Sequence, residues 1–369
     1  MTMKRPYRIM ISGGGTGGHI FPAISIAQAL QHLLGEVELL FVGAQGRMEM
    51  KKVPEAGFEI RGLWISGLQR KLTFDNLLFP VRVVYSIIQS RQLIRQFRPD
   101  VVVGVGGFAS GPLLFTAAKM QVPTLIQEQN SYAGLTNKWL ASRVRRICVA
   151  HDGMEKYFPA RKIAVTGNPV RGGLKLGQEK REEAFRYFNL DPTIPTLLVI
   201  GGSLGARTLN ESVLSGVGLL REAGIQVIWQ TGGYYLEEMK QRTAGMDLSH
   251  VWLRDFISEM GFAYLAADVV ISRAGALSLA ELMLTGRPSV LVPSPNVAED
   301  HQTKNAMALV ERKAAVMIVD KEAGEKLVAT AIALLSDRAQ QKILRENIAA
   351  MAHPHAAIDI AKEVIGLVA

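Results

Sequence analysis

Residues 8–19 read RIMISGGGTGGH, a short apolar run that leads directly into a glycine-rich loop. The same order recurs at residues 196–207, which read TLLVIGGSLGAR, and a stretch with helical spacing of apolar residues follows each loop. A strand, a glycine loop and a helix in succession open a βαβ unit. Two such openings in one chain predict two Rossmann-like domains in tandem.

Further β-branched runs alternate with helix-length segments along the whole chain. Their apolarity is continuous rather than alternating, which indicates sheets that helices cover on both faces. We therefore expect an α/β fold with doubly wound parallel sheets. The expected strands are Arg8–Ser12, Val37–Val42, Val101–Gly104, Thr124–Gln127, Arg146–Val149, Thr196–Ile200, Val227–Gln230, Val251–Leu253, Val269–Ser272 and Ser289–Val292.

With 369 residues, the chain is longer than one hydrophobic core usually organises, which also favours two domains. The Asn168-Pro169 step interrupts regular structure, so we expect a first domain at residues 1–168 and a second at 169–355. Residues 356–369 have the pattern of an amphipathic helix. That helix can pack on the second domain or return to complete the first.

The composition excludes several classes of protein. No run approaches the roughly 18 apolar residues of a spanning helix, and the chain opens with a strand rather than a signal peptide. The single cysteine, Cys148, cannot form an internal disulfide. We therefore expect an intracellular protein that is neither exported nor transmembrane.

The net charge of +9 is unevenly distributed along the chain. Residues 1–168 carry 21 Lys and Arg against 10 Asp and Glu, whereas residues 169–369 carry 21 against 23. The first domain therefore holds all of the positive excess. A domain of this charge predicts an anionic partner, which can be nucleic acid, a phosphorylated substrate or an anionic membrane surface.

Gly13, Gly15 and Gly18 have the G-x-G-x-x-G spacing of dinucleotide-binding loops. A nicotinamide dinucleotide also needs an acid at the carboxyl end of the next strand, but Glu36 and Glu38 lie at that strand's start. NAD(P) is therefore disfavoured. The loop can still bind a phosphate through backbone N–H groups at a helix N-terminus, although its glycines can also serve only a tight turn.

The segment Gly104–Gly111 is a further glycine loop of the first domain, and it follows another expected strand. In a doubly wound sheet, the loops after neighbouring strands share one edge. Two anion-binding loops and the basic charge together predict a diphosphate ligand rather than a single carboxylate. Either loop alone can be purely structural.

His19 lies at the start of the helix that follows the first glycine loop. The positive end of a helix disfavours a protonated imidazole, so a neutral ring can accept a proton near neutral pH. His19 is therefore our candidate general base, with helix capping or packing as the alternative. A nucleotide-sugar enzyme that neutralises its leaving diphosphate with a metal usually needs an Asp-x-Asp pair, and none occurs in this chain. Amides and basic residues such as Arg171 are therefore expected to bind such a diphosphate without a metal.

In the second domain, Ser272–Glu281 has the pattern of a strand end, a tight turn and a helix start. The Glu281 carboxylate can there accept two hydrogen bonds from a ribose diol, or interact only with the helix dipole. His301 and Asn305 share a face of a later helix. They suit sugar hydroxyls or phosphates, and a solvated face is the alternative.

Residues 72–98 interleave apolar side chains with Arg82, Arg91, Arg95 and Arg98. This combination is typical of a surface that enters a membrane interface, where the cations meet anionic headgroups. A core-facing helix with a basic outer face fits the same pattern.

Seven segments, in the same order, resemble the MurG family of glycosyltransferases, and the resemblance covers nearly the whole chain. They are GGGTGGHIFPA (Gly13–Ala23), GVGGFASGP (Gly104–Pro112), EQNSYAGLTN (Glu128–Asn137), GNPVR (Gly167–Arg171), GGSLGAR (Gly201–Arg207), SRAGALSLAE (Ser272–Glu281) and DHQTKNA (Asp300–Ala306).

The resemblance implies a GT-B fold, with two Rossmann-like domains facing a central cleft, and an inverting transfer that requires no metal or cofactor. Some family members have glutamine at the position of His301, so either His301 or Gln302 contacts the sugar or diphosphate. The implied acceptor-diphosphate residues are Gly14, Gly15, Gly106, Gly107 and Ser110. The implied donor residues are Thr16, Gly17, Gly18, Asn130, Arg171, Ser203, Ile257, Ala276, Leu277, Ser278, Leu279, Ala280, Glu281, His301 and Gln302.

The activity that the resemblance implies is transfer of N-acetylglucosamine (GlcNAc) from UDP-GlcNAc to the muramoyl 4-hydroxyl of lipid I, an undecaprenyl-diphosphate-linked muramoyl peptide. The product, lipid II, serves peptidoglycan synthesis and hence cell shape and division. The resemblance also implies a peripheral protein on the cytoplasmic face of the bacterial inner membrane, with no nucleic-acid partner. The alternatives are an NAD(P)-dependent oxidoreductase, a non-catalytic protein that binds anionic lipid or nucleic acid, and a GT-B enzyme with another acceptor.

Overall fold

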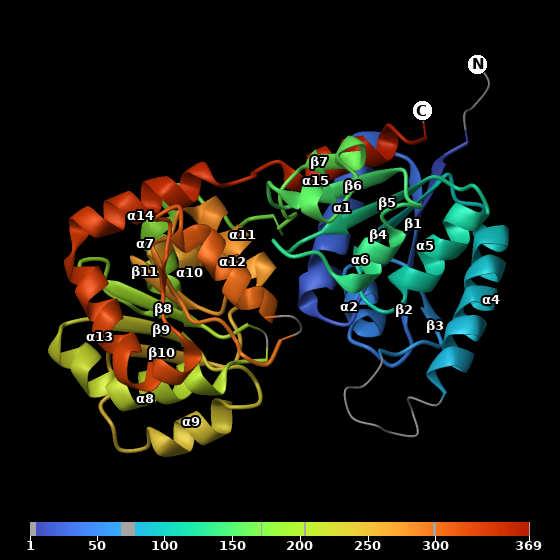
Figure 1. The fold of residues 1–369 in the computed structure, drawn as a ribbon. Coiled ribbons are helices and arrows are strands. Elements are labelled where there is room, and N and C mark those ends of the chain that lie inside the picture. The colour runs from blue at the N-terminus through green and yellow to red at the C-terminus, as the bar shows by residue number, and fades with distance from the viewer. Residues whose placement is uncertain (1–4, 68–77, 171, 203, 298–299, 369) are drawn as a thin grey trace. The chain divides into compact units, whose positions relative to one another are not determined.

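The computed structural model describes residues 5–67, 78–170, 172–202, 204–297 and 300–368. The chain divides into two compact units, residues 1–171 with 355–369 and residues 172–354 (Figure 1). Each unit contains a parallel sheet with helices on both faces. Every strand expected from the sequence is present, with ends that differ by at most two residues.

The first unit is built on a sheet whose strands follow the order β3-β2-β1-β4-β5-β6-β7, all parallel. The chain moves outward from β1 first in one direction and then in the other, which is the doubly wound topology. The elements are β1 (Tyr7–Gly13), α1 (Gly17–Leu34), β2 (Val37–Ala44), α2 (Glu49–Glu55), β3 (Ile60–Leu63), α4 (Phe79–Phe97), β4 (Val101–Gly106), α5 (Ser110–Lys119), β5 (Thr124–Glu128), α6 (Leu135–Leu140), β6 (Arg146–Val149), β7 (Ile163–Val165) and α15 (Ala356–Ile365).

Both faces of this sheet are buried, which explains the continuous apolarity of its strands. Met10 and Val102 belong to a core shared with α4, α5 and α6, whereas their neighbours Ile11 and Val103 belong to a core shared with α1. Successive residues of a strand face opposite sides, so a strand covered on both sides needs an apolar residue at every position.

The last helix, α15, belongs to the first unit although it follows the second in sequence. Ile360 and Val364 are buried in the same core as α1. Arg146 on β6 and Glu363 on α15 form two hydrogen bonds of 2.7 and 2.9 Å, a bidentate ion pair at the sheet.

The second unit has a parallel sheet in the order β10-β9-β8-β11-β12-β13. Helices α8 and α13 cover one face, and α7, α10 and α11 lie on the other (Figure 1). The elements are α7 (Arg181–Phe188), β8 (Thr196–Ile200), α8 (Arg207–Glu222), β9 (Gln226–Gln230), α9 (Leu236–Arg242), β10 (Val251–Arg254), α10 (Met260–Ala266), β11 (Val269–Ser272), α11 (Ala276–Thr285), β12 (Ser289–Leu291), α12 (His301–Val310), β13 (Val316–Met317), α13 (Ala323–Ser336) and α14 (Arg338–Ala350).

Short 3-10 turns complete both units. They are η1 (Met154–Lys156), η2 (Ala160–Lys162), η3 (Gln178–Lys180) and η5 (Asp320–Glu322). None of the described helices is both long enough and apolar enough to cross a bilayer.

Candidate active site

The first glycine loop joins β1 to α1 and leaves the first turn of that helix open. Thr16 is the N-cap residue, and its carbonyl oxygen accepts from the N–H groups of His19 and Ile20. The N–H groups of Gly17 and Gly18 donate no hydrogen bond within the described part of the chain. Helix N-terminal amides of this kind attract anionic oxygens.

The imidazole of His19 is oriented by the loop itself. Its Nδ1 lies 3.0 Å from the carbonyl oxygen of Gly14 and 3.4 Å from Oγ1 of Thr16. A carbonyl oxygen can only accept, so the bond to Gly14 requires the tautomer with hydrogen on Nδ1. In that tautomer Nε2 is the nitrogen that can accept a proton, as a general base must.

The glycine loop after β4 lies against the same imidazole. The Gly106 carbonyl oxygen accepts from the Gly14 N–H at 3.3 Å. A Cβ added at Gly106 would lie only 2.7 Å from Nε2 of His19, and φ at Gly106 is +106°. Both facts require glycine at this position. Gly107 likewise contacts the backbone of Gly14, so the structure brings the two predicted loops together beside the candidate base.

The hydroxyl of Ser110, which was predicted to bind the acceptor diphosphate, is instead engaged within the protein. Its hydroxyl is buried and lies 3.1 Å from both oxygens of Ser12 and 2.8 Å from the carbonyl oxygen of Gly106. This side chain therefore fastens α5 to the two loops. Only the backbone N–H of Ser110, at the start of α5, is left to contact a ligand.

Glu49 contacts the first glycine loop, although no pattern in the sequence pointed to it. Its buried carboxylate accepts from the Gly15 N–H at 2.9 Å and from the Ala44 N–H at 3.0 Å. The amides of Gly14 and Gly15, both predicted to bind the acceptor diphosphate, are thus engaged within the protein. A phosphate at this loop is left with the amides of Gly17 and Gly18.

Asn130 lies just beyond the carboxyl end of β5 and is held there by Glu128. One carboxylate oxygen of Glu128 accepts from the backbone N–H of Asn130 at 3.1 Å and from its side-chain Nδ2 at 3.2 Å. The other oxygen accepts from the N–H of Gly134 and from Nδ2 of Asn137. Four hydrogen bonds to one buried carboxylate fix this loop, and Glu128 is a second supporting residue that the sequence analysis did not assign.

In the second unit, α11 begins directly after the turn that follows β11. Glu281 projects from its second turn and is nearly buried, and one of its oxygens accepts from the Tyr264 hydroxyl at 2.8 Å. A carboxylate has acceptor positions for about four hydrogen bonds, so this bond orients Glu281 without exhausting it. The predicted residues Ala276, Leu277, Ser278 and Ala280 are half-buried, whereas the side chain of Leu279 is in the core.

The remaining described donor residues of this unit lie on the loop after β10 and in the first turn of α12. Ile257 follows β10 and its side chain is buried, so only its backbone can contact a base. Gln302, in the first turn of α12, accepts through Oε1 from the Ser294 N–H at 2.8 Å, which fixes its amide. Its neighbour His301 is half-buried. Asn305 is fully buried and donates to the carbonyl oxygen of Ala274, so it supports the loop after β11.

Two of the predicted donor residues, Arg171 and Ser203, lie outside the described residues. Among the residues that are described, no three His, Cys, Asp or Glu side chains gather as a set of metal ligands.

Comparisons with known proteins match the chain in both units. The family model for the glycosyltransferase family 28 N-terminal domain covers residues 9–149, and that for its C-terminal domain covers residues 196–364. A protein from Cytophaga hutchinsonii named UDP-N-acetylglucosamine–N-acetylmuramyl-(pentapeptide) pyrophosphoryl-undecaprenol N-acetylglucosamine transferase is 52% identical, over 100% of this chain and 99% of its own length. A protein of the same name from Parabacteroides distasonis is 54% identical over 99% of both chains.

The crystal structure of MurG from Acinetobacter baumannii superimposes with a TM-score of 0.76 at 26% identity, covering 98% of this chain and 100% of that one. The chain belongs to the MurG family of glycosyltransferases. The resemblance seen in the seven sequence segments is therefore confirmed, and so is the α/β fold of the GT-B type that it implied. As a MurG-family member the protein is a glycosyltransferase, and the oxidoreductase alternative is not favoured.

Proposed function

We propose that this MurG-family protein transfers GlcNAc from UDP-GlcNAc to the muramoyl 4-hydroxyl of lipid I, which yields lipid II for peptidoglycan. The observation that carries this proposal is identity above 50% along the full length of two transferases whose names specify that donor and that acceptor. The matched length spans both units, and thus the positions that the sequence analysis assigned to the two substrates.

The donor residues are proposed chiefly in the second unit. Glu281 would accept hydrogen bonds from the ribose hydroxyls, with the Tyr264 hydroxyl holding its carboxylate in place. The backbone of Ile257 would meet the uracil, and the amides at the start of α11 would meet the nucleotide. Gln302 would contact the sugar. The hydrogen bond from the Ser294 N–H already holds its amide in one orientation, which lowers the entropy cost of that contact.

The chemical step is proposed for the first unit. The acceptor hydroxyl attacks the anomeric carbon from the face opposite UDP, the bond between that carbon and the UDP oxygen breaks, and His19 Nε2 takes the hydroxyl proton. The Gly14 carbonyl favours this role, because it fixes the tautomer and stabilises the ring once it is protonated. The acceptor diphosphate would meet the amides of Gly107 and Ser110. Because the amides of Gly14 and Gly15 are engaged, it would also meet those of Gly17 and Gly18, which the resemblance had assigned to the donor.

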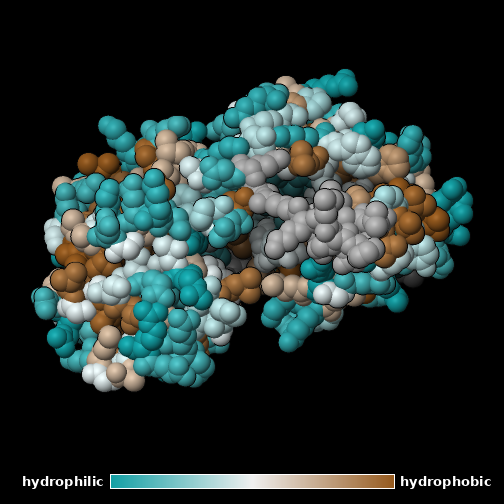
Figure 2. Space-filling view, turned by 60° about the horizontal axis from the view of Figure 1, so that its bottom comes forward, coloured by the Kyte–Doolittle hydropathy of each residue, from teal (hydrophilic) through white to brown (hydrophobic). Residues whose placement is uncertain are grey.

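A membrane surface is proposed on α4. Its outward stripe carries Val81, Val84, Tyr85 and Ile88, which are all exposed, and Arg91 continues the same stripe. Figure 2 shows brown, apolar side chains beside teal ones on the first unit. The exposed apolar residues favour the membrane-interface interpretation of residues 72–98 over a purely core-facing helix, although residues 72–77 lie outside the described part. We infer from this a peripheral location on the anionic inner leaflet.

The first glycine loop is poorly suited to bind a nicotinamide dinucleotide. Pyrophosphate binding in such loops uses the amides of the glycines, and here those of Gly14 and Gly15 donate within the protein. The strand β2 ends at Ala44 and Gln45 follows, so the acid expected for a ribose diol is absent from that position.

The deciding experiment measures UDP release from UDP-GlcNAc by the full-length protein, with and without a lipid I analogue. We expect release that depends on the analogue, a product with a β linkage, and an unchanged rate in the presence of a chelator. UDP release at the same rate with and without the analogue, or thermal protection by NAD but not by UDP, would contradict the proposal.

A further inference from the structure

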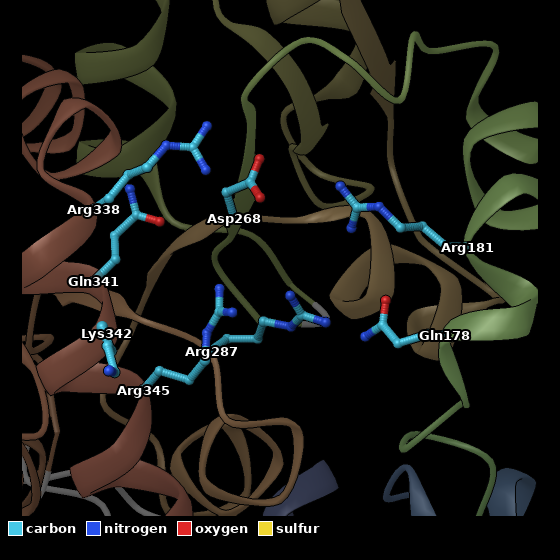
Figure 3. Close-up of a pocket in the computed structure, with 8 residues that line it drawn as sticks. All are labelled: Gln178, Arg181, Asp268, Arg287, Arg338, Gln341, Lys342 and Arg345. Atoms are coloured by element: carbon cyan, nitrogen blue, oxygen red, sulfur yellow. The ribbon is translucent and has the colours of Figure 1, made fainter.

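A further region of the second unit, lined by none of the residues assigned above, is rich in cationic side chains. It is a pocket of about 310 Å³ in the second unit, and its charged lining residues are Arg181, Asp268, Arg287, Arg338, Lys342 and Arg345 (Figure 3). Five cations face one carboxylate. A pocket of this volume suits a small molecule rather than a polymer.

Two helices and one connection bring the cations of the pocket together. Arg338, Lys342 and Arg345 recur at positions i, i+4 and i+7 of α14, which places them on one face of that helix. Arg181 opens α7 on the opposite side of the pocket (Figure 3). Arg287 lies between them, in the short connection from α11 to β12.

Among the described residues, Lys342 is the one cation of the pocket with an ion pair, to Glu346 at 3.9 Å, and the three cations on α14 are exposed. Within the described residues, none of the four arginines forms an ion pair. Arg181 and Arg287 instead donate to the carbonyl oxygens of Leu265 and Ala267, at 3.1 and 2.7 Å. The carboxylate of Asp268 is itself engaged with the N–H of Thr196.

Arg287 is the one cation of the pocket with a buried side-chain nitrogen that has no hydrogen-bond partner among the described residues. That nitrogen is its Nε. Burial, and then the neighbouring charge of Arg345, lower the pKa of Arg287 to about 10. A guanidinium in this position raises the free energy of the empty pocket, and an anion that pairs with it would lower that free energy.

The pocket is distinct from the donor residues because it lies at the other edge of the sheet. Asp268 and Arg287 come just before β11 and β12, at their amino ends, whereas α11 and α12 with Glu281 and Gln302 follow the carboxyl ends. The four residues of β11 alone separate the two edges by roughly 13 Å.

We propose that this pocket binds a phosphate compound carrying at least two negative charges. Guanidinium groups match the geometry of phosphate oxygens in bidentate pairs, and several around one pocket favour a multiply charged group over a single carboxylate. The phosphate can come from a free diphosphate or from a lipid headgroup with two phosphates, as in cardiolipin. Binding at this edge of the sheet goes beyond the proposed transfer reaction and does not depend on it.

The test is calorimetric titration of the full-length protein with inorganic pyrophosphate, together with sedimentation on cardiolipin and phosphatidylcholine vesicles. The pocket variant is Arg338→Gln with Arg345→Gln, since both side chains are exposed on α14 and their loss leaves the core intact. The control variant, Arg221→Gln with Arg242→Gln, removes the same charge from exposed positions elsewhere in the second unit. A Glu281→Gln protein serves as the donor-site control.

We expect the pocket variant to weaken pyrophosphate binding by at least about tenfold, with little change in the control variant or in Glu281→Gln. If the parent does not bind pyrophosphate but does bind cardiolipin vesicles, loss of that binding in the pocket variant alone would assign the same site to a lipid headgroup. Absence of both kinds of binding, or equal losses in the two double variants, would overturn the proposal. Because Glu281→Gln tests the donor residues separately, failure here leaves the transferase proposal standing.

Discussion

The carboxylate of Glu49 accepts a hydrogen bond from the backbone N–H of Gly15 at 2.9 Å, across 34 positions of sequence. Its second oxygen accepts from the Ala44 N–H, so one buried side chain joins the end of β2 to the glycine loop after β1. The loop that carries His19 is thus fixed by an internal anion. This contact gives the loop its shape before any ligand is bound.

Replacing Glu49 by Gln should therefore destabilise the protein. The amide keeps one oxygen acceptor but turns an NH2 group toward a backbone N–H, which leaves a buried donor unpaired at a cost of about 1–3 kcal/mol. Urea unfolding followed by circular dichroism measures this loss. Glu55→Gln, at an exposed position of the same helix, is the matched control and should unfold nearly as the parent does. Equal stability of both variants would show that the Glu49 contact contributes nothing.

The orientation of His19 leads to a second prediction, for kcat. His19→Asn can still donate to the Gly14 carbonyl oxygen but has no nitrogen at the position of Nε2, so we expect kcat to fall by roughly 10²–10⁴ with the fold retained. The KM for UDP-GlcNAc should change little. His32→Ala, at the exposed end of the same helix, is the control. A His19→Asn protein with the parent's kcat would remove His19 from the mechanism.

A third prediction concerns the pair of Tyr264 and Glu281. If Glu281 binds the ribose, Glu281→Gln should raise the KM for UDP-GlcNAc by about tenfold or more, because a hydrogen bond to a charged group contributes about 1.5–3 kcal/mol. Tyr264→Phe should raise that KM less, since it frees the carboxylate without removing it. Glu222→Gln, on the exposed end of α8, controls for the loss of charge. A KM unchanged in Glu281→Gln would place the ribose elsewhere.

How far the sequence predicts this structure depends on whether a feature is local. Each buried central strand carries its own signal, because most of its residues are apolar on both faces. The strands that we did not expect are β3, β7 and β13, and each lies at the edge of its sheet. An edge strand has one neighbour and partly exposed residues, so Ile60–Leu63 contains an arginine and gives no continuous apolar run.

The same distinction holds for the site. The glycine loops and His19 could be predicted, since a strand, a loop and a helix N-terminus are adjacent in sequence. Glu49 could not, because its role depends on how α2 packs against a loop 34 residues away. Glu128 stood within a quoted motif, and its position directly after a buried strand was the signal that could have revealed it.

Cys148 provides a pH-dependent prediction. Burial raises the pKa of its thiol to about 12, whereas the thiol of the unfolded chain has a pKa of about 8.5. Between these two pH values the folded protein keeps the proton that the unfolded chain has lost. A pKa raised on folding contributes stability that is complete below about 8.5 and is lost as pH rises toward 12. The free energy of unfolding should therefore fall with pH more steeply for the parent than for Cys148→Ala. Iodoacetamide at pH 8 should label the thiol only in urea, and rapid labelling of the native protein would contradict its burial.

The exposed stripe on α4 gives the last prediction. Val84 and Ile88 are 59% and 58% exposed, so replacing both by Gln removes apolar surface without opening a core. If this stripe enters the interface, Val84→Gln with Ile88→Gln should weaken binding to phosphatidylglycerol vesicles by about tenfold or more, since fully burying each side chain contributes at most about 1.5–3 kcal/mol. Leu219→Gln with Ile343→Gln, at positions 56% and 51% exposed in the second unit, removes a similar surface and should leave sedimentation unchanged. High salt should weaken binding of the parent to the vesicles, because salt screens the attraction between Arg91, which continues the stripe, and the anionic headgroups. Equal losses in the two variants would mean that general surface hydrophobicity, and not α4, holds the protein at the vesicle.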